Sequence, residues 1–359
     1  MPSFTTVALV AALTRLVSAH PHHMNANVKR DNTLAVELSD AGAAGVGMKV
    51  TNIGSEPLNL LTYATLLDNG PVNKLKVVRE DGSEVGFTGV LFNYDTASLP
   101  AEVFLALSPG ESKDSLVDVA SLYDIQGGTY TISASDVIEY AFMNSTSIEG
   151  VIPYASNELT VEITEDEISK HSPAIKPMAL DKRTQVSSCS GAQGRALRAA
   201  IDYTVGLASN AATAASSGST QKFQEYFRTT SANGRSTVAN RFEAIAQEAS
   251  SQTSGASAYH CTDVLDACSP GVIAYTSPAQ NIIANCDIFY QLPAVSRGCG
   301  DQSQAATVLH EFTHAPGIFP PGTQDFAYGY SASTRLSAQQ AINNADNYAL
   351  YADAIDNNC

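Results

Sequence analysis

The residues best suited to chemistry lie near the C-terminus of this 359-residue chain, in the run His310-Glu311-Phe312-Thr313-His314. Residues four apart share one face of a helix, so the imidazoles of His310 and His314 can reach a single zinc ion. Glu311 follows His310 directly and can lie beside a water molecule on the metal without being a ligand itself. The run therefore predicts a catalytic zinc site, with a chance match on a surface helix as the alternative.

The identity of the third zinc ligand is narrowed, but not decided, by the sequence. A catalytic zinc site has three protein ligands and one open position. His260 is the only further histidine beyond residue 184, and no glutamate follows Glu311. Asp325 follows His314 by eleven residues, after a Pro320-Pro321-Gly322-Thr323 turn that can fold the chain back. The third ligand is therefore His260 or, as we favour, a carboxylate such as that of Asp325.

The elements around this site are predicted to be mainly helical. No helix breaker interrupts the motif before Pro316, and capping-box patterns begin at Ser190 and Ser337. Apolar residues recur at helical spacing on three further segments. They are Leu197, Ile201, Val205 and Ala208; Val238, Phe242, Ile245 and Ala249; and Ala341, Ala345, Tyr348 and Ala352. Residues 272–275 and 282–290 are expected to form strands, so this half combines helices with a small sheet.

The first half of the chain has the pattern of a β protein. Short alternating or β-branched runs are separated by turn signals such as Asp68-Asn69-Gly70-Pro71, and this spacing predicts an all-β sandwich. The expected strands include residues 34–38, 47–51, 75–78, 103–107 and 129–132. We find no catalytic set of residues here, and we assign the cluster His20, His22 and His23 to a solvated tail.

Cysteine usage and the chain ends indicate export and processing. All six cysteines lie beyond residue 188 and no CxxC pair occurs, which favours disulfides formed in an oxidising compartment over cysteine-bound zinc. An apolar run at residues 7–17, followed by small residues, predicts a signal peptide over residues 1–19. The pair Lys182-Arg183 marks the point where cysteines begin to occur, so we expect cleavage there by a kexin-type protease. The expected domains are residues 20–183 and 184–359.

The charge of the chain excludes one class of partner. The sequence contains 20 Lys and Arg residues against 36 Asp and Glu residues, a net charge of −16, whereas a nucleic-acid binder needs a basic face. Residues 20–183 carry −12 of this charge and residues after 184 only −5. No apolar stretch after the N-terminus is long enough to span a membrane. A preference for basic substrates would therefore have to come from a few acids near the zinc.

The motif and the segment that follows it resemble a known family. HEFTH followed by Gly322-Thr323-Gln324-Asp325-Phe326-Ala327-Tyr328-Gly329 is similar to the HExxH…GTxDxxYG signature of the deuterolysins. These are secreted fungal zinc endopeptidases, also called neutral protease 2, of the aspzincin group. The resemblance covers residues from about 30 to 359. It implies one Zn²⁺ per chain bound by His310, His314 and Asp325, with Glu311 as general base.

The same resemblance implies further roles and an architecture. Tyr328 would steady the substrate carbonyl oxygen, and Asp346 would support the site unless it belongs to a solvated helix face. The disulfides would join Cys189 to Cys261, Cys268 to Cys286 and Cys299 to Cys359. A β-rich, sandwich-like propeptide that aids folding and maintains latency would precede a mainly α, zincin-type catalytic domain with a small sheet.

Substrates and alternatives follow from this interpretation. The family resemblance implies basic protein substrates such as histones and protamines, and we expect a monomer. The predicted strand 282–290 is where an extended substrate would pair by β-augmentation. One alternative is that the β-rich half is a permanent binding module. The other is a non-enzymatic secreted binding or adhesion protein with a structural metal site.

Overall fold

Antiparallel strands dominate the N-terminal half of the computed structural model, which describes residues 33–178, 186–187 and 189–359. Three short helices, η1 (Ala101–Val103), α1 (Val119–Leu122) and α2 (Glu165–Ile168), interrupt them. The strands are β1 (Leu34–Gly42), β2 (Gly45–Asn52), β3 (Leu58–Leu61), β4 (Lys76–Arg79), β5 (Leu91–Tyr94), β6 (Phe104–Leu107), β7 (Ser112–Asp118), β8 (Gly128–Ser133), β9 (Ser135–Ala141), β10 (Ile148–Ala155) and β11 (Leu159–Ile163). The five strands expected from the sequence are confirmed as β1, β2, β4, β6 and β8.

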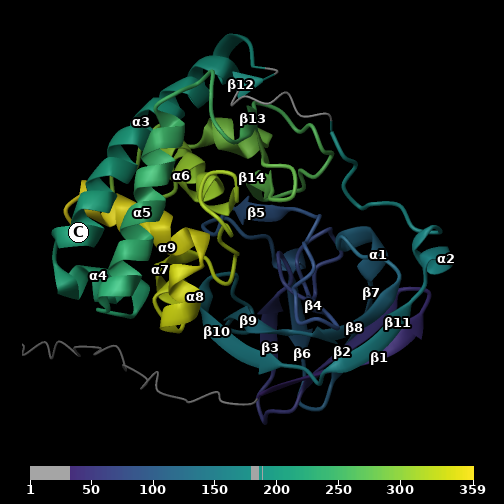
Figure 1. Ribbon diagram of the computed structural model, residues 1–359. Helices are drawn as coiled ribbons and strands as arrows, with labels where there is room; N and C mark the ends of the chain where they lie inside the picture. Colours follow the sequence, from purple (N-terminus) through teal and green to yellow (C-terminus); the bar gives the residue numbers. More distant parts are fainter. Residues whose placement is uncertain (1–32, 179–185, 188) are drawn as a thin grey trace, which may run out of the picture. The chain divides into compact units, whose positions relative to one another are not determined.

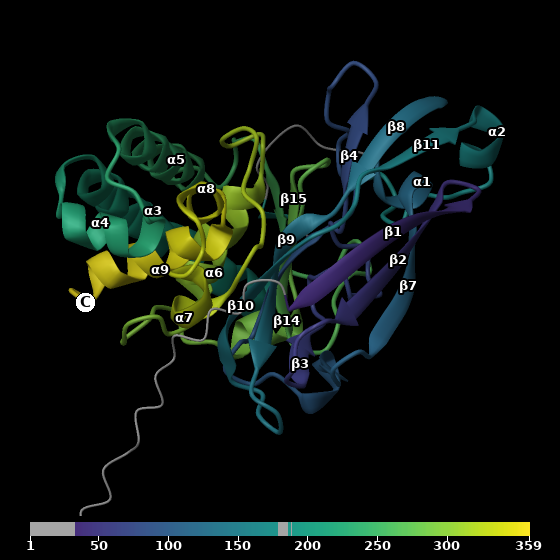
Figure 2. The ribbon, with the colours of Figure 1, turned by 90° about the horizontal axis from the view of Figure 1, so that it is seen from below.

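Ten of these strands form three small sheets, and β5 belongs to a fourth sheet. Their orders are β1-β2-β7, β10-β9-β3-β6 and β11-β8-β4, and Figure 2 shows β1, β2 and β7 side by side. In β2 the side chains of Val46, Met48 and Val50 are buried while the residues between them are more exposed, so one face of the sheet packs inward. The three sheets share one apolar core. The expected β-rich character is present, but a simple two-sheet sandwich is not confirmed.

Helices dominate the C-terminal half (Figure 1). The expected apolar faces are confirmed on α3 and α5, where Leu197, Ile201, Phe242 and Ile245 are fully buried. The helices are α3 (Gly191–Ser217), α4 (Thr220–Phe227), α5 (Ala232–Ala249), η2 (Asp287–Gln291), α6 (Gln304–His314), α7 (Gly329–Ser333), α8 (Ala338–Ile342) and α9 (Ala345–Asp356). This half is therefore mainly helical, as the sequence predicts.

Two details of the helix prediction were wrong and one was confirmed. Ser337 and Gln340 form the expected capping box at α8. Ser190 is the N-cap of α3, but its side chain makes no capping hydrogen bond. The single helix expected after Ser337 is divided into α8 and α9 at Asn343 and Asn344. Because the helix is interrupted there, the Asn344 side chain is free to accept hydrogen bonds from the loop at Phe326 and Ala327.

A five-stranded sheet in the order β12-β13-β15-β14-β5 connects the two halves of the chain. Its strands β12 (Val186–Ser187), β13 (Ala258–His260), β14 (Val272–Ser277) and β15 (Ile282–Asn285) come from the C-terminal half, whereas β5 comes from the β-rich half. Figure 1 shows β5 beside β14, and the pairing is antiparallel. The β-rich and helical parts accordingly belong to one compact unit, Asp31–Cys359.

The expectation that residues 282–290 receive the substrate strand was wrong. β15 ends at Asn285, and η2 follows it. β15 also lies between β13 and β14, so both of its edges are already paired. β14 pairs with β15 along one edge and with β5 of the β-rich half along the other.

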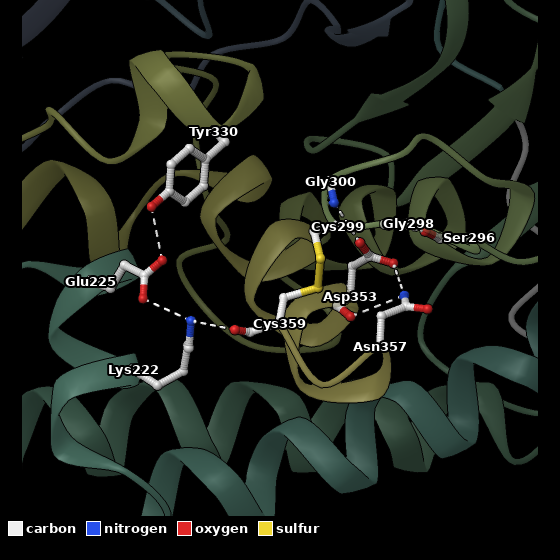
Figure 3. Close-up of a disulfide and its surroundings, with 10 residues drawn as sticks. All are labelled: Lys222, Glu225, Ser296, Gly298, Cys299, Gly300, Tyr330, Asp353, Asn357 and Cys359. Atoms are coloured by element: carbon white, nitrogen blue, oxygen red, sulfur yellow. Dashed lines mark hydrogen bonds and ion pairs between the residues drawn. A yellow bond between two sulfur atoms is a disulfide. The ribbon is translucent and has the colours of Figure 1, made fainter.

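Three disulfides link the C-terminal half. They join Cys189 to Cys261, Cys268 to Cys286 and Cys299 to Cys359, the same pairs that the family resemblance implies. Figure 3 shows the last of these, which ties the loop before α6 to the final residue of the chain. Beside it, Asp353 of α9 accepts hydrogen bonds from the Gly300 amide at 2.7 Å and from Asn357 at 2.9 Å.

Some sequence predictions fall outside the described residues. These are the signal peptide over residues 1–19, the cluster His20, His22 and His23, and the processing pair Lys182-Arg183. Among the helices that the structure does describe, none has the length and apolar character required to cross a membrane.

Candidate metal centre

Helix α6 carries the HExxH motif in a buried position. Ser303 caps its N-terminus by accepting a hydrogen bond from the Ala306 amide at 3.2 Å. Apolar Val308, Leu309 and Phe312 anchor the helix in the core. His310 and His314, one turn apart, are fully buried, as is Glu311. The expected helix therefore places both imidazoles on one face, away from bulk solvent.

Among the residues that the structure describes, His310, His314 and Asp325 bring ligand atoms within 4.8 Å of one another. The Nε2 atoms of the two histidines are 3.2 Å apart. They lie 3.2 Å and 3.1 Å from Asp325 Oδ1 and Oδ2, respectively. Ligands at about 2.0–2.1 Å in a tetrahedral zinc site are about 3.3 Å from each other. The three side chains therefore fit a zinc ion in both chemistry and spacing.

A loop held by hydrogen bonds to α6 and to Asn344 brings Asp325 to helix α6. Gly322 adopts a φ of +86°, and a Cβ there would lie 2.4 Å from the His314 carbonyl oxygen, so the close return of the chain requires glycine. The Thr323 amide then donates to the Thr313 carbonyl at 3.0 Å. Asn344 Oδ1 accepts from the amides of Phe326 and Ala327 at 2.7 Å and 3.2 Å. The turn predicted from the sequence thus positions Asp325 as the third member of the group, and Asn344, at the break between α8 and α9, holds the loop that carries it.

Further polar groups orient the two histidines. The Nδ1 of His314 lies 3.1 Å from the Thr323 carbonyl oxygen, which favours a proton on Nδ1 and leaves Nε2 for a metal. His310 Nδ1 is 3.7 Å from Asp346 Oδ1, too far for a direct hydrogen bond. The other oxygen of Asp346 accepts from the Gly329 amide at 2.6 Å. Asp346 therefore faces the centre and does not lie on a solvated helix face.

Glu311 is held by strand β14. The hydroxyl of Thr276 donates to Glu311 Oε2 at 2.6 Å, while Glu311 Oε1 has no hydrogen-bond partner in the described part of the chain. A buried carboxylate oxygen without a donor is costly, so a further polar group is expected beside it. The sequence reasoning missed Thr276, because no local pattern relates it to a residue 35 positions away.

Tyr328 also lies at the centre, and residues of the β-rich half contact it. Its ring stacks on His310 with centroids 5.9 Å apart, and its hydroxyl donates to the Phe92 carbonyl of β5. Its amide donates to Glu139 Oε1 at 2.8 Å, and Glu139 Oε2 accepts from the Tyr94 hydroxyl at 2.8 Å. Tyr94 and Glu139 were absent from the sequence prediction. His260, the alternative ligand, ends β13 and is not part of the ligand group.

The charges of the ligand group are mutually dependent. Burial by itself lowers the pKa of His310, but the neighbouring carboxylates, Asp325 first and then Asp346 and Glu311, together outweigh burial and raise the pKa to about 10. Burial likewise opposes ionisation of Asp325, yet His314 and His310 lower the pKa of its carboxyl below the ordinary value. Burial raises the pKa of Glu311. Such strongly shifted groups in one buried cluster are typical of a catalytic site.

Two buried imidazoles and a carboxylate at zinc-ligand spacing, with a glutamate next to the first histidine, define the class of the protein as a metallopeptidase. Residues 3–359 match the deuterolysin metalloprotease (M35) family. The chain is 47% identical over 328 residues to a neutral protease 2 homolog of Aspergillus terreus, covering 91% of this chain and 92% of that protein. It is 42% identical over 360 residues to penicillolysin of Penicillium citrinum, covering 99% of each. The chain belongs to the deuterolysin metalloprotease family and is a metalloendopeptidase.

Proposed function

We propose that the chain is a secreted endopeptidase that binds one zinc ion through His310, His314 and Asp325. The observation that best supports this proposal is that the ligand atoms of these three side chains lie within 4.8 Å of one another. Zinc bound by three protein ligands acts as a Lewis acid and lowers the pKa of a water molecule to about 7. The remaining chemistry falls to the side chains of the chain itself.

Glu311 is the general base in this proposal. It lies next to the ligand His310 and has one oxygen without a donor, available to accept a proton from the attacking water. The same carboxyl then gives that proton to the leaving amine. Thr276 holds the other oxygen and so limits the orientations of the carboxylate.

Tyr328 is the electrophilic partner in this proposal. Its hydroxyl already donates to a peptide carbonyl, that of Phe92, while its ring packs on His310. A hydroxyl in this position can stabilise the negative charge that develops on the oxygen of the scissile carbonyl. Asp346, which faces Nδ1 of His310, would act by favouring the orientation of the His310 imidazole.

A preference for basic proteins is supported by acids beside the centre. Asp301, Asp346 and Asp353 line one cavity next to helix α6, together with Asn93 of β5. Three carboxylates in a partly enclosed space favour a cationic side chain more than exposed acids would. A digest of histone and of a neutral protein, read by mass spectrometry, tests whether cleavage sites lie next to Lys and Arg.

We propose the following maturation. Residues 1–19 direct export, a kexin-type protease cuts after Lys182-Arg183, and residues 20–183 act as a propeptide for a monomeric enzyme of residues 184–359. N-terminal sequencing of the secreted product tests the cut, since a first residue of Thr184 is expected. A start near His20 would instead favour the permanent binding module.

The central test of the function compares Glu311→Gln with the wild-type chain. The amide keeps the size of the side chain but cannot accept the proton, so the variant should retain zinc and lose hydrolysis. The wild-type activity should disappear with a chelator and return with zinc. A variant with full hydrolytic activity would reject Glu311 as the base, and an activity insensitive to chelators would reject the metal mechanism. Membership of a peptidase family already speaks against a non-enzymatic adhesion protein.

A further inference from the structure

We propose that strand β5 of the β-rich half occupies the position of a substrate strand and blocks the metal centre. The proposal rests on the proposed peptidase function, because it assigns β14 and Tyr328 to substrate binding. It differs from general latency in naming the blocking segment, Leu91–Tyr94, and the surface that this segment covers.

The first observation is the pairing of β5 with β14. Leu91 lies opposite Thr276, Phe92 opposite Tyr275 and Asn93 opposite Ala274, in antiparallel register. Thr276 is the residue that holds Glu311, so β5 runs directly along the strand that contacts the proposed base. An extended peptide that binds a protease-like cleft gains its backbone affinity by adding to such a strand edge. While β5 is paired, this edge is not available to a substrate.

The second observation is the contact between the Phe92 carbonyl and the Tyr328 hydroxyl. A hydroxyl that can stabilise the oxygen of a scissile carbonyl is here bonded to a backbone carbonyl of the same chain. The Phe92 peptide group therefore lies where a substrate peptide group would lie. This contact is independent of the strand pairing, because Tyr328 comes from the loop before α7 and not from the sheet.

The third observation is that the C-terminal end of β5 is anchored by contacts with both halves of the chain. Tyr94 packs against Tyr328 with ring centroids 4.0 Å apart, and its hydroxyl is held by Glu139 of β9. Gln302 donates to the Tyr94 carbonyl at 3.0 Å, and the Asp95 amide donates to the Gly271 carbonyl at 2.9 Å. The segment is therefore part of a folded, buried contact and not a loosely bound loop.

This arrangement has a consequence for activation. All of these contacts lie far in sequence from Lys182-Arg183, so cutting that pair leaves each of them in place. Cleavage converts an intramolecular contact into a complex of two chains, which can then dissociate on dilution. Activity should therefore appear when the propeptide leaves and not at the moment of cleavage.

A disulfide placed across the strand pair tests the proposal. Directly opposed residues of antiparallel strands have Cα atoms about 4.5–5.5 Å apart, within the range that a disulfide bridges. The full-length chain with Asn93→Cys and Ala274→Cys should form this bond, identified by mass spectrometry of the linked peptides. Asn93→Cys alone is the matched control, since it adds the propeptide thiol without a partner.

Activity is then measured after cleavage at Lys182-Arg183 and dilution. The wild type and the Asn93→Cys control should gain hydrolytic activity, whereas the linked double variant should remain at least tenfold less active until the linking bond is reduced. Failure of the bond to form, or full activity of the linked protein, would overturn the proposal. If the bond forms but the wild type also never hydrolyses a peptide, the strand pairing is established, and both the peptidase function and the blocking role are rejected.

Discussion

The hydroxyl of Thr276 donates a 2.6 Å hydrogen bond to Oε2 of Glu311, which joins strand β14 to the helix that carries both histidines. Both residues are fully buried, so solvent does not replace this bond when it is lost. The hydrogen bond favours the ionised carboxylate and lowers the pKa of Glu311 against the raising effect of burial. Thr276 is therefore a positioning residue for the proposed base.

Replacing Thr276 by valine should reduce kcat by about tenfold while zinc content stays unchanged, in line with the loss of a buried hydrogen bond to a charged group. The hydrogen bond lowers the pKa of Glu311, so its loss should raise that pKa. The acidic limb of the pH–rate profile should therefore move to higher pH. Thr276→Ser keeps the hydroxyl and should restore both values. A reduced rate with an unmoved acidic limb would indicate a packing defect only.

Asp325→Ala should reduce the zinc content from about one ion per chain to nearly none, because two imidazoles alone leave a catalytic site one ligand short. His260→Ala is the matched control, since it removes the alternative histidine. Metal analysis after gel filtration measures both. If the Asp325 variant kept its full zinc content and the His260 variant lost its zinc, His260 and not Asp325 would be the third ligand.

Asp346→Asn should weaken zinc binding by about 10- to 100-fold, the usual cost of removing a carboxylate that supports a ligand histidine. The amide oxygen can still accept from the Gly329 amide, so the loop contact is kept. Asp356→Asn, at an exposed position of the same helix, is the control. Equal zinc affinity of the two variants, measured by competition with a chelator, would remove Asp346 from the site.

Contact between the proposed propeptide, residues 20–183, and the rest of the chain should weaken as pH rises. Burial raises the pKa of Glu139 from 4.5 to about 8, and the nearby Asp346 and Asp325 carboxylates add to the rise. Below pH 4.5 the carboxyl is protonated in both the packed and the released propeptide. Between 4.5 and 8 only the released form ionises, so packing loses up to about 1.4 kcal/mol per pH unit.

Release of the cleaved propeptide should accordingly be at least about tenfold more favourable at pH 7.5 than at pH 5.5. Glu139→Gln stays neutral and should bind with little pH dependence over this window. Size-exclusion chromatography of the cleaved chain at both pH values measures the bound fraction. An equally strong pH dependence in the glutamine variant would assign the effect to other groups.

Removing disulfides should destabilise the chain in the order of the loops that they close. In the chain-entropy model, the Cys299–Cys359 bond, with a separation of 60 residues, contributes about 4 kcal/mol. The Cys268–Cys286 bond, with a separation of 18, contributes about 3 kcal/mol. Paired Cys→Ser variants, compared by urea denaturation, should show the larger loss for Cys299–Cys359. The reverse order would mean that the local contacts around Asp353 (Figure 3) compensate for the longer loop.

The parts of the site that the sequence predicts are those that depend on local geometry. Two histidines four residues apart share a helix face whatever the rest of the fold does, and a proline- and glycine-containing turn can return Asp325 to that face. The apolar faces of α3 and α5 follow from the same periodicity. Tyr328 and Asp346 were reached through the family signature and not through spacing.

The strand that we propose for substrate binding, β14, could not be predicted in this way. β14 and β15 are both buried along their whole length, so the two apolar runs look alike in sequence. In the sheet, however, β15 lies between β13 and β14, whereas β14 pairs with β5 of the β-rich half. Strand order depends on pairing between distant segments, for which alternation within a strand gives no signal.

The sequence by itself determined the kind of chemistry: two histidines at zinc-ligand spacing on one helix face, a glutamate beside the first of them, and a turn that can return a third ligand. Only the tertiary structure decided what surrounds that set. Thr276 reaches Glu311 across 35 residues, Glu139 reaches Tyr328 across 189 and Phe92 reaches Tyr328 across 236. Such contacts arise when separately formed elements pack into one core, and their partners are selected by that packing and not by neighbouring residues in the chain.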